Sequence, residues 1–274
     1  MAKIIAFANS KGGVGKSTSA VNVADMLARS LVGPDGKARA AVLLIDLDPQ
    51  GHAARSLGLA NEKGVCISDF LLGRLAFKDA VLWADRKAEG LPRPNLFVMP
   101  ATQRLRATGL RLMGADLGAM TAGESGELAD ILSHKLGGYA SSFAYVVLDC
   151  PPNLDVFRNA VYNFAPTVVA PVKMDDLSVD GLVQHTADIN AARKAGARAD
   201  LTHILPTMFR ARQTIDQFAL DAIRQRFNGK VADPIPELVA VKEAPAAGGR
   251  TLIEYAPDSP ATAAYARFTT RVKW

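Results

Sequence analysis

Residues 11 to 18 are Lys11-Gly12-Gly13-Val14-Gly15-Lys16-Ser17-Thr18, and they follow the apolar run from Ile4 to Ala8 and lead into a helical pattern. A strand, a glycine-rich turn and a helix in this order place backbone N–H groups around an anion at the N-terminus of the helix. Lys16 adds a positive charge, and the hydroxyl of Ser17 can ligate Mg²⁺. These eight residues therefore predict a phosphate-binding loop whose ligand is a nucleoside triphosphate.

Three aspartates follow apolar runs elsewhere in the chain, namely Asp46, Asp48 and Asp149. An aspartate at the end of a strand is often only a turn or a helix cap, so each one alone carries little weight. Ligands of an open parallel sheet bind outside the carboxyl ends of its strands, which is where the loop and all three aspartates are expected. Together they favour the handling of Mg²⁺ and water beside the phosphates.

The loop departs from the usual pattern, because Ser10 stands where glycine is expected and a second lysine, Lys11, follows it. This pair of lysines resembles the deviant Walker A box of the ParA/MinD family of P-loop ATPases. The resemblance spans nearly all 274 residues and is strongest to the ParA branch that partitions chromosomes and plasmids. It is carried further by Ile45–Gly51, Val146–Pro152 (the Walker B strand), Pro100–Thr102, Leu205–Phe209, and Glu243-Ala244-Pro245 through to Ala264-Tyr265.

The resemblance implies an ATPase that converts ATP and water to ADP and phosphate with Mg²⁺. Gly12 to Thr18 and Lys16 would hold the phosphates, and Ser17, Asp46 and Asp149 would serve the metal. Asp48 would orient the attacking water. The base pocket would involve Pro206, Thr207, Glu243, Ala244 and Pro245, with Thr207 standing where many relatives carry asparagine.

A homodimer also follows from the resemblance. Lys11, as the family's signature lysine, would neutralise charge on the ATP of the opposite subunit, as an arginine finger does in other enzymes. Hydrolysis and pairing would then be coupled through one side chain. The family further implies a ParB-like adaptor that stimulates hydrolysis and releases the dimer from DNA.

The composition and the order of apolar segments predict one α/β domain over residues 1–274. Of all residues 49% are hydrophobic, enough for a full core, and no run approaches the ~18 apolar residues of a membrane span. We expect a cytoplasmic, nucleoid-associated protein with two ordinary buried thiols, Cys66 and Cys150. The predicted fold is a mostly parallel twisted sheet with helices on both faces. Its strands are expected at Lys3–Asn9, Ala41–Asp46, Asn95–Pro100, Ala144–Asp149, Thr167–Val172 and Leu201–Thr207.

The net charge of +5 lies entirely in the last third of the chain. Residues 191–274 contain 13 Lys and Arg against 8 Asp and Glu, whereas residues 1–190 balance at 19 each. A solvated face with cations near helix C-termini would explain this equally well. The alternative is non-specific contact with DNA phosphates, strengthened when an ATP-held dimer doubles the contacts. The candidate DNA-binding residues are Arg193, Lys194, Arg198, Arg210, Arg212, Arg224 and Arg226.

Three other functions remain open. One is a MinD-like or other cargo-positioning ATPase that acts on a membrane or on a protein assembly. The membrane case would need a basic amphipathic tail, and Ala261, Tyr265 and Phe268 share one helical face near the end of the chain. Core packing is the favoured interpretation of that face, so a membrane partner is not expected. An electron donor of the nitrogenase iron-protein type would need paired cysteines for a shared cluster. A scaffold that does not turn over is disfavoured by Lys11, Asp48 and Asp149.

Overall fold

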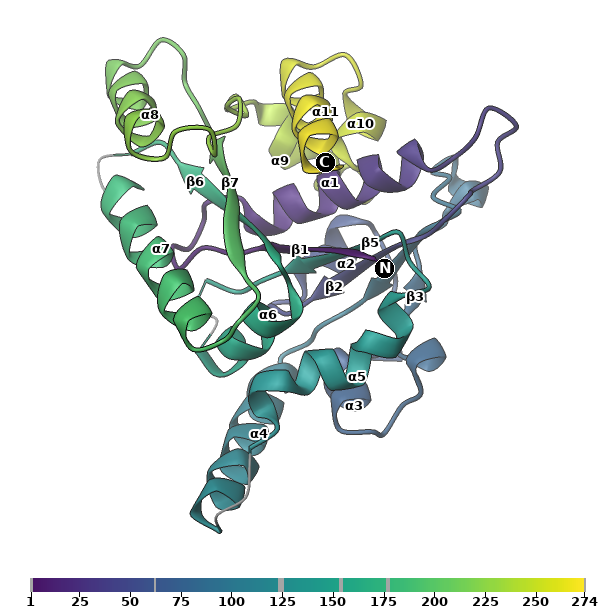
Figure 1. Cartoon of the computed structure of the whole chain (residues 1–274). Coiled ribbons are helices and arrows are strands. Elements are labelled where there is room, and N and C mark those ends of the chain that lie inside the picture. The colour runs from purple at the N-terminus through teal and green to yellow at the C-terminus, as the bar shows by residue number, and fades with distance from the viewer. Residues whose placement is uncertain (1, 62, 123–125, 153–154, 176–177, 274) are drawn as a thin grey trace.

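The computed structural model describes residues 2–61, 63–122, 126–152, 155–175 and 178–273. Its centre is a seven-stranded sheet in the order β3-β4-β2-β5-β1-β6-β7 (Figure 1). The neighbouring strands are parallel except for the antiparallel pair of β3 and β4. The strands are β1 (Lys3–Phe7), β2 (Val42–Asp46), β3 (Leu82–Trp83), β4 (Leu96–Met99), β5 (Tyr145–Asp149), β6 (Thr167–Lys173) and β7 (Asp200–Thr207).

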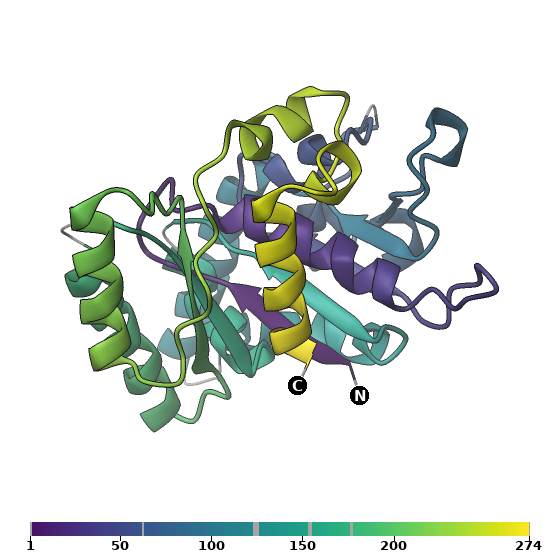
Figure 2. The same cartoon turned by 90° about the horizontal axis from the view of Figure 1, so that it is seen from above.

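Helices connect the strands and cover both faces of this sheet (Figures 1 and 2). In addition, short 3-10 turns lie at Phe77–Asp79, Lys87–Glu89, Leu128–Asp130 and Asp155–Phe157. The helices are α1 (Lys16–Ser30), α2 (His52–Ser56), α3 (Ile67–Leu71), α4 (Arg104–Thr121), α5 (Ile131–Ala140), α6 (Arg158–Phe164), α7 (Ser178–Lys194), α8 (Thr214–Arg226), α9 (Val239–Ala246), α10 (Leu252–Tyr255) and α11 (Pro260–Lys273).

The side chains of β1 alternate between two apolar cores, one on each face of the sheet, as the pleat of a strand requires. Ile4 and Ala6 belong to the core that includes residues of α3 to α8. Ile5 and Phe7 belong to the core shared with α1 and α11, which pack against each other. The predicted sheet with helices on both faces is therefore confirmed.

All six predicted strands are present, and their ends differ from the predicted ones by at most two residues. The two-residue strand β3 was not predicted, because a pair of residues is too short to show alternation. At the other end of the chain, Ala261, Tyr265 and Phe268 are buried in the core with α1, which confirms the core interpretation of α11. The hydroxyl of Ser259 caps this helix by accepting a hydrogen bond from the N–H of Thr262 at 3.1 Å.

Two further expectations concern membranes and cysteines. Among the helices of the described ranges, none combines the length and the apolar character needed to cross a bilayer. Cys66 and Cys150 are both free thiols and both fully buried, as expected. This burial argues against the iron–sulfur alternative, because neither thiol reaches a surface where two subunits could share a cluster.

Candidate active site

The glycine-rich loop joins β1 to α1 at the carboxyl edge of the sheet. Gly13 and Gly15 have φ angles of 70° and 83°, in the left-handed region that favours glycine. Gly15 is the N-cap residue that precedes α1, and no side chain caps the first turn of that helix. The N–H groups of this turn consequently point to the space where an anion can bind.

Lys16 lies inside the loop rather than on its surface. Its side chain is only 6% exposed, and its ammonium donates a hydrogen bond to the carbonyl oxygen of Lys11 at 2.7 Å. Burial lowers the pKa of Lys16, and the charge of Asp149 opposes that shift. A cation therefore stands within the glycine-rich loop, and its binding of phosphate stays a prediction.

Asp46 and Asp149 end the adjacent strands β2 and β5 and are register partners. Both are fully buried. The carboxylate of Asp46 accepts hydrogen bonds from the N–H groups of Asp48 and Ala53, at 2.9 and 3.0 Å, while burial raises its pKa to about 7. Burial also raises the pKa of Asp149 well above its usual range, and the neighbouring Asp46 carboxylate adds to this effect.

The carboxylate of Asp149 is left without a hydrogen-bond partner. Both of its oxygens are buried and unpaired within the described part of the chain. The hydroxyl of Ser17 is near enough to lower the pKa of Asp149 but does not complete a hydrogen bond with it. A buried, unpaired carboxylate costs ~1–3 kcal/mol or more, so this site is suited to a cation or to water bound to one.

The donor set around Asp149 fits Mg²⁺ in a particular way. No cluster of three or more His, Cys, Asp or Glu able to hold a metal occurs among the residues that the structure describes. Mg²⁺ is typically held by one or two carboxylates, waters and the phosphates of a substrate rather than by an all-protein cage. Ser17, Asp46 and Asp149 fit that pattern, because they stand beside the phosphate loop.

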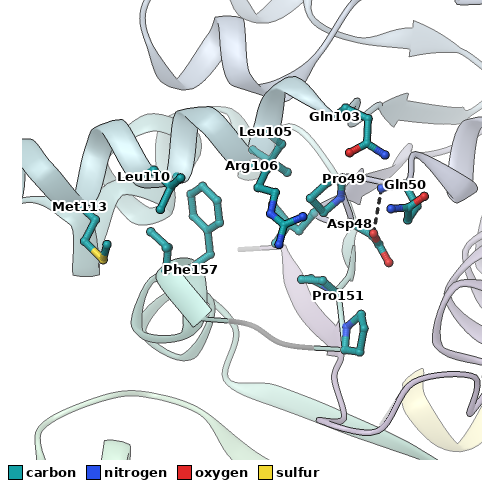
Figure 3. A pocket seen from close by; sticks show the side chains of 14 residues that line it. Asp48, Pro49, Gln50, Gln103, Leu105, Arg106, Leu110, Met113, Pro151 and Phe157 are labelled. Carbon is teal, nitrogen blue, oxygen red and sulfur yellow. Dashed lines mark hydrogen bonds between the residues drawn. The ribbon is translucent and has the colours of Figure 1, made fainter.

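Asp48 lies two residues beyond β2, at the end of a groove of about 610 Å³. It is 9% exposed, and one carboxylate oxygen accepts a hydrogen bond from the N–H of Gln50 at 2.9 Å. Figure 3 shows Asp48 and Gln50 at one end of the groove and Leu110 and Met113 at the other. Asp48 is thus near the buried Asp46 and lines the groove, although little of its side chain is exposed.

Lys11 does not extend freely from the loop. Its ammonium is 2.7 Å from the Oδ1 atom of Asp175, which follows β6 in the same chain. Both side chains are about one-third exposed, at 35% and 34%. The backbone N–H of Lys11 donates to the side chain of Asn9 at 3.0 Å. In the single chain Lys11 is therefore held in cis, and its reach across a dimer stays a prediction.

A second pocket of about 290 Å³ is lined in part by Gly15 and Thr18 of the glycine-rich loop and α1. It contains the predicted Thr207 and Pro245, but Pro206, Glu243 and Ala244 are not among its lining residues. Glu243 instead accepts a hydrogen bond from the hydroxyl of Tyr255 at 3.1 Å. The other lining residues were not predicted as part of the site. Met208 and Tyr265 lie in stretches that carry the family resemblance, and the rest come from segments without a motif: Ile235, Pro236, Glu237, Leu238, Val241 and Lys242.

The seven predicted DNA-binding residues are all exposed, but they form two groups. The C-terminus of α7 lies close to the start of β7, since only a few residues connect them. α8 begins after the end of β7, and Val231, which follows α8, pairs in parallel with Ile204 in the middle of β7. The chain therefore returns along the strand through α8, so that the C-termini of α7 and α8 both lie toward the start of β7. The group at this end, called the basic end below, is Arg193, Lys194, Arg198, Arg224 and Arg226.

Arg210 and Arg212 lie at the opposite end of β7, and two of the seven cations already have carboxylate partners. Arg210 bonds to the fully buried Asp216, with N–O distances of 2.8 and 3.2 Å. Arg193 bonds to Asp200 at 2.9 Å. The structure does not bring all seven into one surface, because the strand separates the loop before α8 from the helix ends.

Comparisons with known proteins identify the family of this chain. A family model described as an AAA domain matches residues 2–203. The chromosome-partitioning ATPase Soj of Thermus thermophilus is 34% identical over 272 residues, 98% of this chain and 94% of the relative. The chromosome partitioning protein ParA of Caulobacter vibrioides is 31% identical over 254 residues, 92% of this chain and 86% of the relative.

Among solved structures, a cobyrinic acid a,c-diamide synthase of Mycobacterium smegmatis, crystallised with an ATP analogue and magnesium, has the same fold. The TM-score is 0.76 at 24% identity, covering 98% of this chain and 93% of the other. A synthase and partitioning ATPases can thus share one architecture, so the fold alone does not identify the reaction.

Proposed function

Because this chain belongs to the ParA/MinD family of P-loop ATPases, we propose that it is a partitioning ATPase. It hydrolyses ATP with Mg²⁺, pairs as an ATP-bound homodimer and binds DNA without sequence preference. A ParB-like adaptor stimulates its hydrolysis, and the cargo is a plasmid or a chromosome. The protein accordingly works in the cytoplasm on the nucleoid.

The unpaired, buried carboxylate of Asp149 beside the phosphate loop is the observation that carries the ATPase proposal. The uncapped first turn of α1 and the buried ammonium of Lys16 bind the phosphates, because both concentrate positive charge in one small space. Ser17, Asp46 and Asp149 hold Mg²⁺, directly or through water. When bound, the metal neutralises the charge that develops on the phosphates.

Asp48 orients the attacking water from one end of the groove. Its carboxylate is fixed by the N–H of Gln50 at 2.9 Å, so one oxygen is positioned while the other remains available to water. Phosphoryl transfer depends mainly on position and electrostatics, and such a fixed acceptor is what the reaction needs. Lys11 leaves Asp175 on pairing and stabilises the phosphates bound by the partner.

The basic end supplies the DNA contacts. Its five cations are exposed, and within the described ranges Arg193 alone of the five is paired with a carboxylate, that of Asp200. A few phosphate contacts bind DNA weakly at physiological salt, whereas a dimer presents twice as many on one particle. DNA binding therefore follows ATP-dependent pairing.

The proposal is tested by measuring retention on random-sequence DNA with ATP, with ADP and without nucleotide. We expect retention with ATP only. The double variant Arg224→Glu and Arg226→Glu should lose at least about tenfold in DNA affinity and reduce the salt dependence, while ATP hydrolysis without DNA is unchanged. The matched control is the exposed pair Lys78→Glu and Lys87→Glu, remote from the basic end. Equal retention in all three nucleotide states contradicts the switch, and equal loss in both double variants contradicts the assigned surface.

A further inference from the structure

One face of α4 exposes large apolar side chains in a regular row. Leu110, Met113, Leu117 and Met120 are 58%, 47%, 62% and 62% exposed. Their spacing of three, four and three residues places them on one side of the helix, next to the stripe of Leu105 and Thr108 that packs on the body of the protein. We call the four residues the α4 stripe. It was not identified from the sequence, because exposure cannot be read from spacing.

The α4 stripe continues a groove that begins at the active site. Leu110 and Met113 line the groove together with Asp48 and with Pro151, Pro152 and Phe157, which follow β5 (Figure 3). Pro152 also borders the phosphate loop, since a Cβ added to Gly12 would be 4.0 Å from the Cβ of Pro152. The groove thus begins beside the loop that carries Lys11 and reaches the first two residues of the α4 stripe.

The outer half of α4 is poorly supported by its own chain. The helix projects from the body of the molecule, and its buried residues are confined to its first two turns (Figure 1). Gly114 and Gly118 lie in the exposed half and have no neighbouring atoms within 4 Å of an added Cβ. Each glycine weakens a helix interior by about 1 kcal/mol relative to alanine, so this segment gains from external packing.

We propose that the α4 stripe packs against the α4 stripe and groove of a second copy of this chain in the ATP-bound dimer. The spacing of the stripe is the seam spacing with which two helices pair, and an identical partner offers the same seam. The position of the groove also fits a dimer interface, because the groove adjoins the loop from which Lys11 must reach the partner. The inference rests on the proposed function, in that the dimer is the one that ATP assembles.

Pairing through α4 has a consequence for the reaction. The partner's helix would cover the groove, which Asp48 lines at one end. A dimer therefore shields the water from bulk solvent, whereas the separate chain leaves it exposed. ATP hydrolysis should accordingly be slow in the monomer even when ATP is bound.

The experiment compares Leu117→Glu with Phe218→Glu, whose side chain is 71% exposed on α8, far from the groove. Mass is measured with Mg²⁺ and a non-hydrolysable ATP analogue, together with nucleotide affinity and thermal unfolding of the nucleotide-free chain. We expect Leu117→Glu to weaken the dimer at least about tenfold and to leave affinity and unfolding unchanged. Phe218→Glu should dimerise normally. Mixing Leu117→Glu with Leu117→Lys should restore dimers, because opposite charges then face each other.

The outcomes separate this inference from the function on which it rests. A wild-type chain that stays monomeric with the analogue removes the proposed dimer itself. A wild-type dimer that Leu117→Glu leaves intact overturns the α4 seam alone. If that intact variant also loses its stimulation by an adaptor-loaded cargo complex, the stripe is the adaptor's site and the pairing of α4 is wrong.

Discussion

The ammonium of Lys11 lies 2.7 Å from the carboxylate of Asp175, and both residues belong to the same chain. Lys11 follows β1 and Asp175 follows β6, so the pair ties the phosphate loop to the neighbouring strand. If Lys11 acts on the partner's ATP, this ion pair must break when the dimer forms. The ion pair of Lys11 with Asp175 thus competes with dimer formation.

Asp175→Asn should strengthen the ATP-dependent dimer. An ion pair whose members are about one-third exposed contributes up to about 1 kcal/mol, and the dimer breaks two of them, so we expect the dimer dissociation constant to fall by up to about 30-fold. Analytical ultracentrifugation with the ATP analogue measures it. Lys11→Ala is the reference, since it removes both the pair and the cation and should weaken the dimer. A weaker dimer for Asp175→Asn shows that Asp175 supports pairing instead.

Asp48→Ala should bind ATP and dimerise but hydrolyse ATP about 10²- to 10⁴-fold more slowly, as expected for loss of a group that positions the reacting water. Single-turnover hydrolysis is the measurement. Asp48→Asn is the matched variant, because an amide oxygen can still accept the hydrogen bond from Gln50 while the charge is lost. Normal turnover in either variant contradicts the role of Asp48.

Asp149→Asn should weaken ATP binding in the presence of Mg²⁺ by about 10- to 100-fold, because a supporting carboxylate of the metal is lost. Most of the gain in ATP affinity that Mg²⁺ gives should therefore disappear. The same change should raise the thermal stability of the nucleotide-free chain at pH 8, since it replaces a buried, unpaired carboxylate by a neutral amide. Calorimetric titration with and without Mg²⁺ gives the first result and a thermal scan the second. The exposed Asp79→Asn should change neither quantity, and unchanged Mg²⁺ dependence in Asp149→Asn removes Asp149 from the metal site.

His185 should make the folded chain less stable in mild acid. Burial lowers its pKa to about 4, and the Nε2 atom has no hydrogen-bond partner in the part of the chain that the structure describes. The unfolded chain therefore binds more protons between pH ~6.5 and ~4, so stability falls as the pH falls through this window. We expect His185 to account for about 1–2 kcal/mol between pH 7.5 and pH 5.

Urea unfolding of the wild type and His185→Gln at both pH values measures this contribution. His203, whose pKa burial also lowers to about 4, acts in the same direction, so the difference between the two proteins isolates His185. His203→Gln serves as the parallel control. Identical pH dependence in wild type and His185→Gln contradicts the assignment.

The sequence alone was sufficient for six of the seven strands, the glycine-rich turn and the acidic strand ends. Each of these depends on local pattern: buried parallel strands are continuous apolar runs, and a glycine-rich turn before a helix is specific in itself. Asp46 and Asp149 were expected at one edge because parallel strands end on the same side. Their register pairing confirms this.

Tertiary structure alone decided which side chains meet across long separations. The ion pair of Lys11 with Asp175 joins residues 164 positions apart, and half of the lining of the second pocket, such as Ile235 and Leu238, comes from segments that carry no motif. The sequence also did not show which polar residues are buried. Arg93, in a segment without a motif, is almost fully buried and forms an ion pair with Glu254 at 2.6 Å. The α4 stripe is the opposite case, because its large apolar side chains are exposed rather than buried. Periodicity gives the direction of a side chain on its helix, but what lies opposite depends on the packing of the whole chain.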